Sequence, residues 1–446
     1  MPRPLFFPAT LVSVGLFFAT TSQGQNLTIQ EAAKRVLAHY PLVAAAQARR
    51  ELTRRELGEA TAQRFPSITS SATAVRYKEP MVVTPIHGFT PGRAPEFDDV
   101  LLQNVLTADW LLFDGFGRSG RIDQRRALLN AADEDLELVE QTLLASTIEA
   151  YLRVLGLSGT LAAHDRRLEA LESEEDRVRQ LRDTGRAPEL EVRRVAAGVA
   201  SARAERVRLA FALDVSEREL AHFVAADASE TRADRLVSVS LSDVALAPRT
   251  ALLAEALGAS PAVRAAVERT GAAEAAVRTA RSAHWPSVRV VGIYTSYGDS
   301  EADFEHEWNA GLRLQVPLFT GGALTSRVGQ TLAARAAAEA ELELARMRLE
   351  SELDRAVAAL EEARARVTSL EVAAQQFAEV ARIEKLRLDT ESGTQTDYLE
   401  AEAERLVAEA QLVEAYLTEV ASCVEIARLT GALDLSWIEE ALEAGS

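Results

Sequence analysis

The chain has 446 residues, of which 48% are hydrophobic and 26% are charged. That apolar fraction is enough to bury a large core, which argues against a disordered chain. The 67 acidic residues outnumber the 49 basic ones, and the formal net charge at pH 7 is -18. A nucleic-acid partner requires a basic surface, so this balance argues against nucleic acid as a partner.

Residues 1–24 have the pattern of an export signal peptide. Arg3 supplies a positive charge, an apolar stretch follows, and small residues at 22–24 suit a cleavage site. Beyond this segment no stretch approaches the ~18 to 20 apolar residues that a membrane-spanning helix needs. Cys423 is the only cysteine, so no cysteine stands at the cleavage site to carry a lipid. We expect an exported chain that is not lipidated at its N-terminus.

The rest of the sequence contains two copies of one plan. Residues 64–68 (RFPSI) match residues 284–288 (HWPSV), and the segment at 185–190 matches the segment at 393–398. Each copy reads helix, strand, loop, strand, very long helix, turn and long helix. The predicted divisions are a first repeat at 25–226, a linker or equatorial segment at 227–249, a second repeat at 250–431 and a C-terminal tail at 432–446.

Alternating apolar and polar residues, or a high content of Thr, Val, Ser and Tyr, predict the strands. The predicted strands span residues 67–77, 99–113, 287–297 and 307–318. About ten residues per strand suits a tilted membrane strand. Aromatic residues are expected in two belts, one with Phe65, Trp110 and Trp285 and the other with Tyr77, Phe97, Tyr297 and Trp308. The alternative is a soluble β-sandwich with one solvent-exposed face, because alternation alone is compatible with membrane strands and with a sandwich.

Two proline-free runs predict unusually long helices at residues 118–182 and 323–391, each followed by a second helix, at 187–226 and 395–430. At ~1.5 Å per residue, each long helix would reach roughly 100 Å. A seven-residue repeat predicts coiled-coil seams along them. The seam positions of the second copy are Leu353, Leu360, Val367, Ala374 and Ala381, together with Leu342, Leu349, Ala356, Ala363, Leu370 and Phe377. An ordinary antiparallel bundle fits these seams equally well but leaves the paired strands unexplained.

Each strand pair is joined to its long helix through a Phe-polar-Gly sequence, WLLFDGFG at residues 110–117 and VPLFTGG at residues 316–322. Gly115, Gly321 and Gly322 are expected to allow the backbone angles of a strand-to-helix bend. Pro317 is expected to end the strand ladder. Four membrane strands cannot close a barrel, whereas two chains would supply eight strands and three would supply twelve, with room for a lumen.

These features together resemble the TolC-type outer-membrane efflux proteins. The resemblance rests on the duplicated plan, the Phe/Trp-Pro-Ser strand entry, the PLFTGG strand exit and the GTQTDYLEA helix start, and it covers residues 27–431. It implies a mainly α fold with a small membrane β part. Three chains would form a twelve-stranded barrel in the outer membrane of a Gram-negative bacterium, continued by a periplasmic α-helical barrel. It also implies docking onto a periplasmic adaptor and an inner-membrane transporter for drug, metal or protein export.

The resemblance also implies roles for residues near the helix-hairpin tips. Acidic residues ring the periplasmic entrance in that family, and the matching positions are Asp397 and Glu400, which could share one helix face. Gly185 and Gly393 mark the tip turns, where an adaptor would dock. A solvated helix start, with acidic residues favoured by the helix dipole, is the alternative interpretation of the acidic pair.

No nucleophile elbow, phosphate-binding loop, pair of catalytic carboxylates or metal motif stands out, so we expect neither an enzyme nor a cofactor. The predicted function is an outer-membrane exit duct of a tripartite efflux or type I secretion system, which conducts solutes passively. The main rival is an exported coiled-coil scaffold or binding protein whose strands form a soluble domain.

Overall fold

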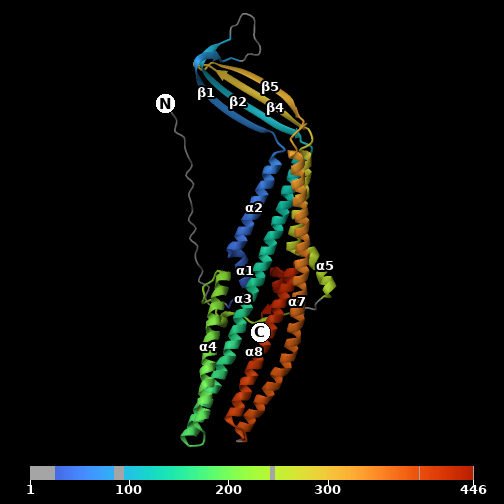
Figure 1. The fold of residues 1–446 in the computed structure, drawn as a ribbon. Coiled ribbons are helices and arrows are strands. Elements are labelled where there is room, and N and C mark those ends of the chain that lie inside the picture. Colours follow the sequence, from blue (N-terminus) through green and yellow to red (C-terminus); the bar gives the residue numbers. More distant parts are fainter. Residues whose placement is uncertain (1–25, 85–94, 242–246, 391, 445–446) are drawn as a thin grey trace, which may run out of the picture.

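The computed structural model describes residues 26–84, 95–241, 247–390 and 392–444 (Figure 1). The predicted signal peptide at 1–24 therefore lies outside the described residues. The molecule is elongated, with a sheet at one end and two long helical hairpins whose turns lie at the other end (Figure 1). No helix within the described ranges is both long enough and apolar enough to cross a membrane.

One four-stranded antiparallel sheet combines strands from both copies. Its members, in spatial order, are β1 (Ser67–Val82), β2 (Phe97–Phe113), β4 (Ser287–Gly298) and β5 (Phe304–Gln315). The predicted end of the last strand at residue 318 is wrong, because β5 ends at Gln315. Pro317 has no N–H to donate, so the ladder stops before it.

One face of the sheet is apolar and is not covered by the rest of the described chain. Trp110 lies opposite Val290, which lies opposite Leu312, so the three side chains share that face. Leu312 is 74% exposed. The other face carries the ion pair between Asp109 and Arg289. A broad exposed apolar surface of this kind marks contact with lipid or with another molecule.

The expected place of Trp308 in an aromatic belt at the strand ends is wrong. Trp308 lies opposite Tyr294, inside the ladder between β4 and β5, and β5 already begins at Phe304. The expectation failed because Glu305, His306 and Glu307 are consecutive polar residues without alternation, so the sequence does not mark that pairing begins before Trp308.

Two helices run the whole length from the sheet to the far tip. They are α3 (Gly117–Asp183) and α7 (Ala323–Asp389), each of 67 residues, or roughly 100 Å at ~1.5 Å per residue. The helices α4 (Glu189–Val224) and α8 (Gln395–Leu429) return from the tips. Shorter helices complete the bundle: α2 (Pro41–Ala62) and α6 (Pro261–Ser282) run up to the sheet, whereas α1 (Ile29–His39) and α5 (Arg249–Ala259) lie midway along the molecule (Figure 1).

The two long helices have different neighbours. α3 packs against α2 and α6 near the sheet and against α4 and α8 toward the tip. α7 packs against α6 near the sheet and against α8 toward the tip. Several predicted seam residues of α7 are buried in these contacts, namely Leu349, Leu353, Ala356, Leu360, Ala363, Ala374 and Ala381. The long helices are therefore held by tertiary packing along their length, as helices of this size require.

Midway along the molecule, four distant parts of the chain meet. The segment predicted as a linker contains a short 3-10 helix, η1 (Ala233–Arg235), and strand β3 (Val239–Leu241). The predicted C-terminal tail contains α9 (Leu435–Ala441) and β6 (Leu442–Ala444), and β6 pairs antiparallel with β3. The hydroxyl group of the buried Tyr151 in α3 accepts a hydrogen bond from the Val237 N–H and lies 2.8 Å from the Leu27 carbonyl oxygen, to which it donates.

Candidate functional site

The two strand-to-helix bends lie where the sequence places Gly115, Gly321 and Gly322. Their φ angles are 63°, 61° and 84°, in the left-handed region that residues with a Cβ rarely adopt. In the first bend Phe116 also has a positive φ, of 68°. The Asp114 carboxylate accepts a 2.6 Å hydrogen bond from the Arg118 N–H and so satisfies one of the free donors at the start of α3.

The two tip turns lie at the end of the molecule farthest from the sheet (Figure 1). Gly185 has a φ of 73°, and its N–H donates to the Arg182 carbonyl oxygen at 2.8 Å. Gly393 is required for a different reason, because a Cβ built on it would lie 2.8 Å from the Cβ of Arg387. Both turns therefore depend on glycine, the first for its backbone angle and the second for close approach.

Asp397, one of the two predicted gate residues, forms a capping box with Thr394 at the start of α8. The Asp397 N–H donates to the Thr394 hydroxyl, and the Thr394 N–H donates to the Asp397 carboxylate, both at 3.2 Å. These bonds satisfy two of the unpaired donors that every helix start exposes. The hydrogen bonds from Thr394 lower the pKa of Asp397 below its usual value.

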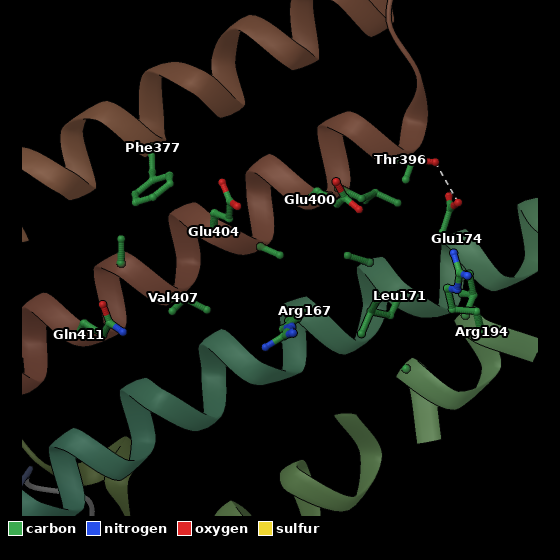
Figure 2. Close-up of a pocket in the computed structure, with 16 residues that line it drawn as sticks. Arg167, Leu171, Glu174, Arg194, Phe377, Thr396, Glu400, Glu404, Val407 and Gln411 are labelled. Carbon is green, nitrogen blue, oxygen red and sulfur yellow. Dashed lines mark hydrogen bonds between the residues drawn. The ribbon is translucent and has the colours of Figure 1, made fainter. Parts of the chain in front are cut away.

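Glu400, the second predicted gate residue, has a different environment. It is exposed and lines a cavity between the two hairpins, where Figure 2 shows it one turn from Glu404. The two predicted gate residues therefore belong to the same helix start, but one carboxylate caps the helix while the other faces the cavity.

A polar bridge that sequence reasoning missed joins the two hairpins beside this cavity. The Thr396 hydroxyl in α8 donates to Glu174 in α3 at 2.9 Å (Figure 2). Glu174 is only 8% exposed and is paired with Arg177 at 2.6 Å. Arg177 also contacts Thr396, and its hydrogen bond with Glu174 raises its pKa. A buried carboxylate of this kind requires such partners. No sequence signal connects Glu174 and Thr396, which are 222 residues apart.

The cavity has a volume of about 670 Å³ and is lined by residues of α3, α4, α7 and α8. Figure 2 shows its apolar side chains, including Leu171, Phe377 and Val407, between charged ones. Among the residues that the structure describes, no group of three or more His, Cys, Asp or Glu side chains is placed to hold a metal ion.

A sheet with one uncovered apolar face, continued by long helical hairpins, defines the class of outer-membrane channels. A membrane protein from Pseudomonas aeruginosa has this fold, with a TM-score of 0.77 and 20% identity over 90% of this chain and 93% of that one. The CmeC outer membrane channel of Campylobacter jejuni has a TM-score of 0.76 and 15% identity over 92% of this chain and 88% of that one.

The family model described as outer membrane efflux protein matches residues 32–226 and 252–432, so the chain belongs to the outer membrane efflux protein family. It is also 28% identical to Protein CyaE of Bordetella pertussis over 361 residues, which are 76% of this chain and 70% of CyaE. The predicted resemblance, fold class and function as an outer-membrane exit duct are thereby confirmed. A scaffold or binding protein with a soluble strand domain is set aside.

Proposed function

We propose that three copies of the chain close into a homotrimeric duct with a twelve-stranded barrel in outer-membrane lipid. The observation that carries this proposal is the sheet order β1-β2-β4-β5, in which β1 and β5 have neighbours on one side only within the described chain. A free strand edge in a bilayer leaves backbone N–H and C=O groups without partners. Three copies of a four-stranded sheet give twelve strands, and a barrel of that size has room for a lumen.

The edges of the helical layer support the same arrangement. On α4, Val207, Phe211 and Val215 form an apolar stripe with exposed fractions of 51%, 68% and 51%. On α7, Val372 and Ile383 are 56% and 42% exposed. The two stripes lie on helices at opposite edges of the distal half (Figure 1). Contact between α4 of one copy and α7 of the next is heterologous, and such contacts form a ring when the rotation between copies closes, as a barrel of three copies requires.

The duct is passive and is driven by partners, because the sequence carries no nucleotide-binding motif. Its partners are a periplasmic adaptor protein and an inner-membrane transporter, in a tripartite efflux or type I secretion system. The adaptor docks at the tip turns marked by Gly185 and Gly393, which lie farthest from the membrane sheet (Figure 1). The barrel itself anchors the chain, so the N-terminus needs no lipid.

The periplasmic mouth is acidic in this proposal. In a closed trimer Asp397 and Glu400 would recur three times around the axis and concentrate negative charge at the tip. Glu400 is exposed and has no ion-pair partner within the described parts of the chain, which leaves its charge available to a passing solute. Cations would therefore enter more readily than anions.

A measurement of the oligomeric state tests the proposal of a trimeric duct. We expect the mature protein to be extracted from outer membranes with detergent and to run on a gel as a band of three chains that heating converts to single chains, each somewhat smaller than the 48.4 kDa of the whole sequence. Phe211→Glu should remove this band, because a charge would be buried in the contact between copies, whereas Phe211→Leu should keep it. A water-soluble monomer would reject the duct.

A further inference from the structure

The cavity between the hairpins has the size and lining of a small-molecule site. Its volume of about 670 Å³ falls within the ~300 to 1,000 Å³ that is usual for ligand pockets. The bridge residues Glu174 and Thr396 stand at one end of it (Figure 2). Half-buried apolar side chains from all four helices supply an apolar lining: Leu171, Val195, Phe377, Leu399 and Val407.

The charged side chains that line the cavity without a partner are separated by sign, while Glu174 of α3, which also lines it, is paired with Arg177. Arg167 in α3 and Arg194 in α4 belong to the first hairpin, whereas Glu400 and Glu404 belong to α8 of the second. Within the described ranges, none of these four side chains has an ion pair or hydrogen-bond partner. The two hairpins therefore bring uncompensated cations and uncompensated anions to the same space.

Two arginines of these helices that do not line the cavity are paired. Arg405, the neighbour of Glu404 in α8, binds Glu402 at 2.6 Å and also pairs with Glu409. Arg203 in α4 binds Glu172 of α3 at 2.7 Å.

We propose that this cavity binds a zwitterionic amphipathic small molecule. Its anionic group, a carboxylate or similar acid, contacts Arg167 and Arg194, because guanidinium groups bind planar oxyanions through paired hydrogen bonds. Its cationic group faces Glu400 and Glu404, and its apolar body lies against Phe377 and the other apolar side chains. Charge-assisted hydrogen bonds on two opposite walls would fix the orientation of the ligand.

Size decides between a small molecule and a helix of another protein. The α8 residues that line the cavity run from Thr396 to Gln411, a length of ~22 Å. A helix of that length and ~10 Å in diameter occupies about 1,800 Å³. That volume exceeds the volume of the cavity, so a helix would not fit within it.

Rhodamine B and its ethyl ester form a matched pair of probes for this proposal. At pH 7.5 rhodamine B is a zwitterion with an aromatic body, whereas the ester has lost the carboxylate and is only a cation. Fluorescence anisotropy would be measured with the purified full-length protein in a non-ionic detergent, with empty micelles as the blank. We expect rhodamine B to bind about tenfold more tightly than the ester, because it alone contacts the two arginines.

Substitutions of cavity charges identify the site. The double variant R167Q/R194Q should lose the preference for rhodamine B while it still binds the ester, and E404Q should weaken both dyes several-fold. R203Q and E409Q, which alter paired charges on α4 and α8 outside the cavity, should change neither affinity. Both cavity arginines are exposed and unpaired in the described chain, so their loss is compatible with folding.

Three results would overturn the proposal: equal affinity for the two dyes, an unchanged preference in R167Q/R194Q, or no binding above that of empty micelles. The gel assay for the trimer is run on the same samples, so that the two proposals can fail separately. A monomer that keeps the dye preference would reject the duct and retain the site, whereas a trimer without the preference would do the opposite.

Discussion

The two longest helices, α3 and α7, are corresponding elements of the two sequence repeats, but they have different neighbours. Both have 67 residues, yet 17 residues of α3 are buried against 7 of α7. α3 has neighbours on both sides along its length, whereas α7 lies at an edge of the layer. A duplicated sequence plan therefore does not give two equivalent helices. The second copy carries exposed apolar positions on α7, such as Val372 and Ile383, that a further copy would cover in the proposed trimer.

The two bends that lead into these helices also differ in how closely other atoms pack around them. A Cβ on Gly115 would lie 2.5 Å from the Trp285 Cβ and 2.9 Å from the Ser282 carbonyl oxygen. A Cβ on Gly321 or Gly322 would meet no described atom within 4 Å. Phe319, beside the second bend, is 90% exposed. Packing and backbone angle both fix the first bend, while the backbone angle alone fixes the second.

The largest predicted effect comes from alanine at the two bends. Gly115→Ala should lower the free energy of unfolding by about 2 to 4 kcal/mol, because it adds a collision with backbone to an unfavourable φ. Gly321→Ala should cost only about 1 kcal/mol, for the φ alone. Chemical denaturation of detergent-solubilised protein, followed by circular dichroism at 222 nm, would measure both. Equal losses would show that the second bend is packed against a neighbour as tightly as the first.

Much of this architecture follows from the sequence, because its signals are periodic or local. Alternation located the strands, the seven-residue repeat located the α7 seams that are buried at Leu353 and Leu360, and Gly-containing bends marked each strand exit. The pairing of β3 with β6 could not be predicted. Each strand has only three residues, and about 200 residues separate them along the chain, so no periodicity connects them.

The candidate site was only partly predictable, because only some of its contacts join residues that are close in the sequence. Thr394 and Asp397 stand three residues apart before an apolar run, which is the sequence pattern of a capping box, so this contact had a local signal. The cavity charges Arg167, Arg194 and Glu404 come from three helices and meet only through tertiary packing. Nothing in the local sequence distinguishes them from the paired charges around them.

Loss of the capping box should have a smaller effect on stability, and this effect should appear at the start of α8 but not at the start of α4. Thr394→Ala should destabilise the first turn of α8 by about 1 kcal/mol, the usual effect of losing a helix N-cap. The first turn of α4 begins after Pro188, which makes no side-chain capping bond, and should be unaffected. Hydrogen exchange of the amides in the first turn would show about fivefold faster exchange in α8 only. Thr394→Ser, which keeps the hydroxyl, is the control.

The same capping box should depend on pH. The pKa of Asp397 is lowered in the folded chain by its hydrogen bonds with Thr394. Its contribution is therefore complete above the unfolded-state pKa of ~3.9 and is lost as the pH falls through the lower folded-state value. Protection of the first turn of α8 should be constant from pH 7 to about pH 5 and decline only in more acidic solution. A decline already at neutral pH would contradict the assignment of Asp397 as the capping group.

The smallest predicted effect concerns ion selectivity and compares one acidic residue from each tip. Glu189 in the first hairpin is paired with Arg182 at 3.5 Å and Arg193 at 3.1 Å. Glu400 has no ion-pair partner within the described chain, so its charge is not compensated locally. In planar bilayers, E400Q should lower the cation-to-anion permeability ratio about twofold, whereas E189Q should leave it nearly unchanged. D397N/E400Q should lower the ratio further.

Ionic strength distinguishes this charge effect from a change in the shape of the mouth. The Debye length shortens from ~10 Å at 0.1 M salt to ~3 Å at 1 M. The difference between wild type and E400Q should therefore be clear at 0.1 M and nearly absent at 1 M. A difference that persists at 1 M would mean that the substitution has altered the geometry of the tip. An effect of E189Q as large as that of E400Q would mean that the ion pairs of the first tip do not hold in the assembled duct.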